Sequence, residues 1–148
     1  MDIREVHMPA DGAKRVLFAE DTEQENEEYQ TNKCADEPLP AMYSAMNALV
    51  PFVLDRCEIA KGFGNDMTVR TVKFVPRPEG QSICVTFIKV LKDGAKLVWT
   101  TPQKAIEEDS TTMQLCNRIK TEATKWINKE RLQADLLEAE STGTDGEA

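Results

Sequence analysis

Three apolar segments in the second half of the chain have the pattern of β-strands. Residues 67–75 alternate loosely and are rich in β-branched side chains, 82–91 have the strongest strand pattern, and 96–101 return the chain. Segments that contain proline, aspartate and glycine separate the three. We therefore expect a three-stranded antiparallel meander with residues 82–91 as its middle strand.

Two other segments repeat apolar residues at helical spacing. Residues 38–60 carry a methionine-rich apolar stripe, and Pro51 within it should kink the helix or split it in two. A methionine stripe can form an adaptable partner groove, but an ordinary core face is the favoured interpretation. Residues 110–137 predict a second, longer helix with Ser110 as its N-cap. Both helices should pack on the meander.

The remaining segments complete one α+β domain over residues 1–137. Residues 1–19 predict a possible additional β-hairpin around an Asp-Gly turn. Residues 20–37 hold eight acidic residues and one lysine, so we expect a flexible acidic loop. Residues 138–148 are acidic and polar, and we expect a disordered tail. The expected fold is thus a three-stranded antiparallel meander packed against two helices.

Composition narrows the class of protein. The 148 residues carry a net charge of −8, with no apolar stretch long enough to span a membrane and no secretory signal pattern. Four widely spaced cysteines and one histidine do not have the paired spacing of a zinc site, so free thiols are expected. These features indicate a cytoplasmic protein without a metal site or a membrane partner.

No catalytic constellation is recognisable in the sequence. His7 is the only histidine, and a Ser-His-Asp or Cys-His arrangement would have to use it. Paired carboxylates occur only in strongly acidic runs, where nothing would raise the pKa of one for acid catalysis. We expect a non-enzymatic protein without catalytic residues or cofactors.

Charge is distributed unevenly along the chain. Residues 67–104 contain seven basic and two acidic residues, whereas residues 20–37 are strongly acidic. A basic sheet with an aromatic platform could hold single-stranded nucleic acid, and the candidate residues are Arg70, Lys73, Lys89, Lys96 and Trp99. Lysines on edge strands also protect against aggregation, which is the alternative interpretation. The candidate acidic, DNA-mimicking surface is Glu23, Glu25, Glu27 and Glu28.

One pentapeptide near the C-terminus suggests a specific partner. Gln133-Ala134-Asp135-Leu136-Leu137 resembles the peptides that bind the bacterial sliding clamp. The resemblance implies that Gln133 enters one subsite, Asp135 makes a polar contact, and Leu136 and Leu137 fill an apolar pocket. The alternative is that these leucines are the last apolar turns of the long helix.

A broader resemblance covers the segment from Thr101 to Gln133, which is similar to the C-terminal part of small uncharacterised bacteriophage and prophage proteins. Our leading hypothesis is therefore a phage-type accessory protein of DNA replication or recombination. It would act in the cytoplasm of the host cell by binding host machinery, with the sliding clamp as the candidate partner. Single-stranded nucleic acid is a second candidate ligand. Two alternatives remain: an inhibitor of host defence or nuclease machinery that uses the acidic surface, and a homo-oligomeric structural or assembly protein that uses an exposed sheet edge or the methionine stripe.

Overall fold

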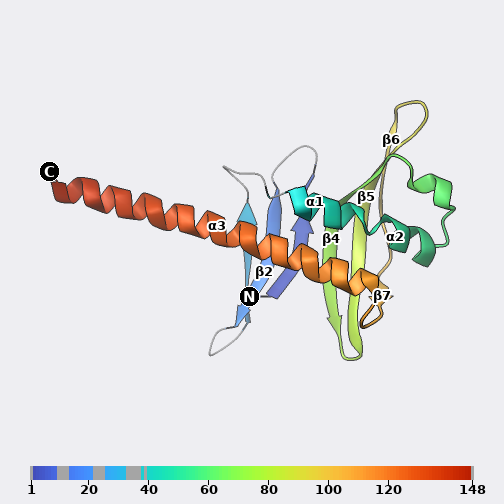
Figure 1. Ribbon diagram of the computed structural model, residues 1–148, viewed down its shortest axis with the longest axis horizontal. Helices are drawn as coiled ribbons and strands as arrows, with labels where there is room; N and C mark the ends of the chain where they lie inside the picture. The colour runs from blue at the N-terminus through green and yellow to red at the C-terminus, as the bar shows by residue number, and fades with distance from the viewer. Residues whose placement is uncertain (1, 10–13, 22–25, 33–37, 39, 148) are drawn as a thin grey trace.

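The computed structural model of the chain describes residues 2–9, 14–21, 26–32, 38 and 40–147 (Figure 1). Its side chains are described for residues 2–9, 14–19, 38 and 40–129. Within these residues, an antiparallel sheet lies behind a layer of helices, and the last helix extends far beyond the sheet.

The described sheet contains seven antiparallel strands. Six lie side by side in the order β3-β2-β1-β4-β5-β6. The short strand β7 pairs with the first half of β5, whereas β6 pairs with the second half. The two longest strands, β4 and β5, pair along their whole length, so they form the centre of the meander. The strands are β1 (Asp2–His7), β2 (Arg15–Asp21), β3 (Asn26–Asn32), β4 (Met67–Arg77), β5 (Gly80–Val90), β6 (Lys96–Thr100) and β7 (Lys104–Ile106).

The described helices cover one face of the sheet (Figure 1). They are α1 (Pro40–Asn47), α2 (Val50–Arg56), a 3-10 turn η1 (Lys61–Gly64) and α3 (Thr111–Glu147). Pro51 lies in the first turn of α2, where its missing N–H has no intrahelical partner to lose. The single helix predicted for residues 38–60 is therefore two helices, which are separated by a turn at residues 48–49 just before Pro51.

The core lies between the sheet and the helices. Alternate residues of β4 and β5 point into it, and Val72, Ile83 and Phe87 are almost fully buried. The methionine stripe of α1, Met42 and Met46, is buried too, so it belongs to the core and is not a partner groove. Burial of each such side chain contributes on the order of 1.5–3 kcal/mol to folding. In the part of α3 whose side chains are described, up to residue 129, the buried ones are Cys116, Ile119, Glu122, Ala123, Trp126 and Ile127.

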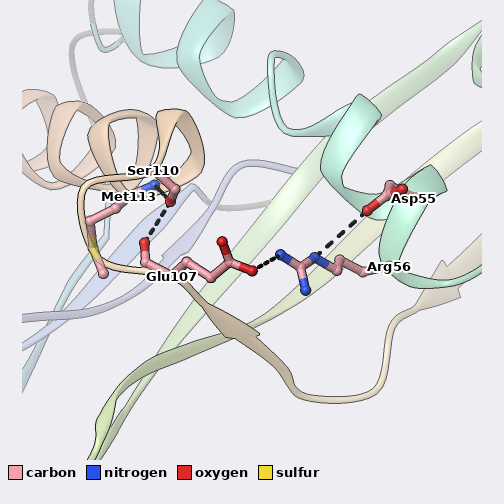
Figure 2. Close-up of polar contacts among 5 residues, drawn as sticks. All are labelled: Asp55, Arg56, Glu107, Ser110 and Met113. Carbon is pink, nitrogen blue, oxygen red and sulfur yellow. Dashed lines mark hydrogen bonds and ion pairs between the residues drawn. The ribbon is translucent and has the colours of Figure 1, made fainter.

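Polar contacts fix the start of α3 (Figure 2). Ser110 Oγ accepts a hydrogen bond from the Met113 N–H at 3.1 Å and donates one to the Glu107 carbonyl at 2.6 Å. The predicted N-cap is therefore confirmed. Arg56, at the end of α2, pairs with the Glu107 carboxylate at 3.0 Å and lies 3.8 Å from Asp55. These contacts join the end of α2 to the loop that enters α3.

The α+β class, the meander and the N-terminal hairpin are confirmed, but the prediction of a three-stranded sheet was wrong. Strand β1 pairs antiparallel with β4, and the buried Val6 lies opposite the buried Val72. The apolar face of the hairpin therefore continues that of the meander, and the two units form one sheet. Strand β7 was not predicted because three residues carry no periodic signal.

Two further segments differ from expectation. Within the predicted acidic loop 20–37, residues 26–32 form β3 and pair with β2 over seven residue pairs. Main-chain pairing does not require apolar side chains, which explains how an acidic segment can extend a sheet. Helix α3 was expected to end near residue 137 but continues to Glu147, through a segment that begins with the good helix formers glutamate and alanine.

Candidate binding surface: the edge of the sheet at β6

Strand β6 exposes all five of its residues, in contrast to its neighbour β5. Its three apolar residues are Leu97, Val98 and Trp99, and Val98 is 62% exposed. Val90, the last residue of β5, and Leu91, which follows it, are exposed as well. An exposed cluster of large apolar side chains on one hairpin marks a candidate interaction surface.

The main chain of β6 has an open side. The register pairs Phe87 with Trp99 and Lys89 with Leu97. Main-chain hydrogen bonds flank these two pairs: the Leu91 N–H donates to the Ala95 carbonyl at 2.8 Å, and the Thr101 N–H donates to the Val85 carbonyl at 2.9 Å. Hydrogen-bonded and non-hydrogen-bonded pairs alternate in an antiparallel ladder, so Leu97 and Trp99 point their N–H and C=O groups toward β5.

The residues between them, Lys96, Val98 and Thr100, therefore point their N–H and C=O groups away from the sheet. None of the described strands pairs with this side of β6. Such an edge is a template for another strand.

A tight turn holds β6 beside β5. Gly94 adopts φ +87°, which suits glycine because it has no Cβ, and its N–H donates to the Leu91 carbonyl at 2.9 Å. The Asp93 carboxylate accepts the Ala95 N–H at 2.9 Å. The turn thus presents the exposed edge on a fixed hairpin, which projects past α2 at the top right of Figure 1.

The side chains of β6 are divided between the two faces of the sheet. Trp99 lies on the helix-covered face, where its ring packs edge-on against the buried Phe87 ring with centroids 5.5 Å apart. Leu97 shares that face because it lies two residues away. Val98 lies on the open face, across from Ile88 of β5. A strand added at this edge would therefore meet apolar side chains on both faces.

The open face of the sheet carries a polar row across four strands. His7 Nδ1 is 2.5 Å from Thr71 Oγ1, and the Thr86 and Thr100 hydroxyls are 2.8 Å apart. The register places these residues side by side, as His7–Thr71, Thr71–Thr86 and Thr86–Thr100. Burial and the nearby Arg15 lower the pKa of His7, while Glu5 acts in the opposite direction. His7 lies in β1, which has a neighbouring strand on each side, and its ring is hydrogen-bonded within the sheet.

The five predicted nucleic-acid residues do not gather on one face. Lys89 lies on the helix side with Trp99, donates to the Asn65 carbonyl, and has its Nζ 5.2 Å from the centre of the Phe63 ring. Lys96 pairs with Val90 and Lys73 pairs with Cys84, and these pairs place both lysines on the open face. Arg70 lies at a bulge in β4, and its Nε is buried without a hydrogen-bond partner among the described residues. The nucleic-acid interface stays a prediction, and its candidate residues lie on both faces of the sheet.

The other predicted binding residues lie where side chains are not described. Gln133, Asp135, Leu136 and Leu137 fall within the helical backbone of α3. Of the acidic surface, Glu27 and Glu28 belong to the backbone of β3, whereas Glu23 and Glu25 lie outside the described residues. Both hypotheses stay predictions.

Chemistry elsewhere in the described part of the chain is sparse. Of the cysteines, Cys57, Cys84 and Cys116 are free thiols, as expected, and Cys34 lies outside the described residues. Burial raises the pKa of the Cys116 thiol to about 12, so it is a core residue and not a nucleophile. A hollow of about 590 Å³ lies beside α2, lined by Pro51, Leu54, Asp55, Glu58, Ile59 and Lys61.

Neither a metal centre nor a membrane span emerges from the described residues. No three of their His, Cys, Asp and Glu side chains come together in a group that could hold a metal ion. None of their helices is both long enough and apolar enough to cross a bilayer.

Sequence reasoning identified Trp99 and Lys96 but not the apolar cluster around them. The sequence predicts that Val90, Leu91, Leu97 and Val98 lie in strands, but their pattern does not predict that they are exposed. The signal was present: the segment from Lys96 to Thr100 is short and precedes Pro102, which is typical of an edge strand. No protein-family model, curated protein sequence or solved structure matches this chain.

Proposed function

We propose that this chain is a non-enzymatic binding protein that docks a partner protein at the edge of β6. The observation that carries the proposal is the open main chain of Lys96, Val98 and Thr100, flanked by exposed Leu97 and Trp99. Addition of a strand to a sheet edge gains affinity from main-chain hydrogen bonds and specificity from alternate side chains. The β6 edge offers both elements.

Trp99 is the anchor of this surface. Tryptophan is enriched among residues that dominate binding energy, because it buries a large area with little loss of conformational entropy. The Phe87 ring holds the Trp99 ring in place before a partner arrives, so less ordering is needed on binding. An extended partner segment with alternating apolar residues fits this surface best.

A host protein as partner, and a role in phage DNA replication, remain part of the proposal only through the sequence at residues 133–137. Direct contact with nucleic acid has less support, because Lys89 and Trp99 lie on the face opposite Lys73 and Lys96. The sheet edge at β6 is supported by main-chain geometry and by exposed apolar surface together.

Selection of short random linear peptides displayed on a carrier tests the proposal. The key variant is Val98→Pro, because the Val98 N–H points outward and proline there removes a donor that β5 does not use. The matched control is Val98→Ala, which keeps the N–H. We expect selected peptides to alternate apolar residues, to bind the wild-type and the alanine variant, and to lose at least tenfold in affinity for the proline variant.

The proposal is wrong if the protein, applied as a monomer, selects no peptide, or if the selected peptides bind the wild-type and the Val98→Pro variant equally well. Folding of the proline variant is checked by circular dichroism and by its unfolding transition, so that lost binding is not confused with lost structure.

A further inference from the structure

We infer that the strand which occupies the β6 edge is β6 of a second copy of this chain, paired antiparallel about a two-fold axis at Val98. The inference rests on the proposed function, because it names the occupant of the same edge. Most oligomers of a single chain are two-fold dimers in which one surface pairs with itself. The surface must then be complementary to itself in hydrogen bonds, side chains and charge.

The hydrogen-bond pattern of β6 meets the first condition. The outward-pointing residues are Lys96, Val98 and Thr100, which lie symmetrically about Val98. In the two-fold arrangement, Val98 exchanges both main-chain bonds with Val98 of the second copy. Lys96 pairs in the same way with Thr100 of that copy, and Thr100 with its Lys96. Every outward N–H and C=O of the strand therefore finds a partner.

The side chains meet the second condition. Between the hydrogen-bonded pairs, Leu97 lies opposite Trp99 of the second copy, and Trp99 lies opposite its Leu97. In such non-hydrogen-bonded pairs the side chains come closest together. On the open face, Val98 lies against Val98. Pairs of aromatic and aliphatic side chains across strands stabilise a sheet by roughly 0.2–1 kcal/mol each.

Charge and proline select this register over its neighbours. A two-fold axis at Lys96 would place two lysines directly opposite each other, which is destabilising. An axis at Thr100 would place Val98 opposite Pro102, which has no N–H to donate. With the axis at Val98, the two Lys96 residues are more than about 13 Å apart along the strands. That distance exceeds the Debye length of about 8 Å at physiological ionic strength, so their repulsion is screened.

The area of the surface sets the strength of the dimer. The exposed fractions of Val90, Leu91, Leu97, Val98 and Trp99 correspond to apolar surface on the order of 400 Å² per copy. A stable interface buries about 800 Å² per partner, so a dimer through β6 alone belongs to the weak class. We expect a dissociation constant on the order of tens of micromolar.

Cysteine cross-linking under mild oxidation with a diamide-type oxidant tests the register. Two Val98 Cα atoms at the axis would be about 5.5 Å apart, within the range of about 4.4–6.8 Å that a disulfide spans. The variant Val98→Cys should form a disulfide-linked dimer, and peptide mapping should show residue 98 joined to residue 98. The matched control, Lys96→Cys, should not cross-link to itself. The wild-type chain, oxidised in parallel, reports disulfides of the native cysteines.

Analytical ultracentrifugation over a wide concentration range accompanies the cross-linking. We expect the wild-type to pass from monomer to dimer, and Val98→Pro to remain monomeric at tenfold higher concentration. Growth beyond the dimer would overturn the inference, because it indicates pairing of β6 with a different edge. Equal cross-linking at positions 96 and 98 would also overturn it.

A wild-type monomer at all concentrations that still binds the selected peptides at β6 would overturn the inference and leave the proposed function intact. A monomer that binds no peptide would contradict both.

Discussion

The rings of Phe87 and Trp99 pack edge to face across β5 and β6, with centroids 5.5 Å apart and an interplanar angle of 75°. Phe87 is fully buried, whereas Trp99 is 39% exposed. One ring belongs to the core and the other to the candidate docking surface, so the pair connects the packing of the core to the position of β6. A partner that docks on Trp99 rests on a ring which the core already holds in place.

Substitutions of this pair should differ in their effect on stability. Phe87→Ala opens a cavity in the core and should lower the free energy of unfolding by about 3–5 kcal/mol. Trp99→Ala loses the aromatic contact and part of a buried area, for which we expect about 1–2 kcal/mol. Val98→Ala, on the exposed face, should change it by less than about 0.5 kcal/mol. Urea unfolding measures all three, and equal losses for Phe87→Ala and Val98→Ala would contradict the assignment of the two faces.

The contacts before α3 permit a second comparison. Ser110→Ala removes the cap of the Met113 N–H and should lower the free energy of unfolding by about 1 kcal/mol. Glu107→Gln breaks the ion pair with Arg56. The Arg56 side chain is 39% exposed and that of Glu107 is 74% exposed, so the loss of unfolding free energy should be below about 1 kcal/mol and should shrink in high salt. Thermal unfolding at two salt concentrations measures both. A larger loss for Glu107→Gln than for Ser110→Ala would contradict this interpretation.

His7 should make stability depend on pH. Burial lowers its pKa in the folded protein below the ordinary value of 6.5, so the unfolded chain binds the proton more readily. The stability that neutral His7 contributes is fully present above pH 6.5. It is lost as the pH falls from 6.5 through the lowered folded-state pKa. His7→Gln should therefore flatten the dependence of unfolding free energy on pH in that window, as followed by denaturant titrations at several pH values. Identical pH dependence in wild-type and variant would refute the assignment.

The pentapeptide predicts a separate contact. If Gln133 to Leu137 bind a bacterial sliding clamp, Leu136→Ala combined with Leu137→Ala should weaken binding to the purified clamp at least tenfold, because two apolar anchors are lost. Leu132→Ala, outside the pentapeptide, is the matched control. Since α3 is helical through this segment, binding in an extended form would also require local unwinding of the helix. Surface plasmon resonance with immobilised clamp measures the effect, and unchanged affinity of the double variant would exclude the hypothesis.

Local patterns predicted much of this fold. The strong strand pattern of residues 82–91 identified β5, the spacing of Ile119, Ala123 and Trp126 identified the buried face of α3, and Ser110 marked the start of that helix. Long-range pairing was not predictable from such patterns. Nothing near Val6 indicates that β1 will lie beside β4. The paired residues His7 and Thr71, for example, are 64 positions apart in the sequence.

The same limit explains the candidate site. The apolar residues of β6 alone resemble those of an interior strand, and only the short length of the segment and the nearby Pro102 indicate an edge. Their exposure follows from the order of strands in the sheet, in which β6 is last. The main-chain direction of Val98, on which the docking proposal depends, follows from the pairing register with β5.

Residue-resolved amide hydrogen exchange of β6 tests the central claim most directly. It is measured by NMR on the protein at its lowest and highest accessible concentrations and in the presence of a saturating selected peptide. The account predicts that the amides of Leu97 and Trp99 exchange slowly in every sample, because they bond to β5. The amides of Lys96, Val98 and Thr100 should exchange fast in dilute protein and slow down when the edge is occupied. Fast exchange of these three amides in every sample would contradict the account.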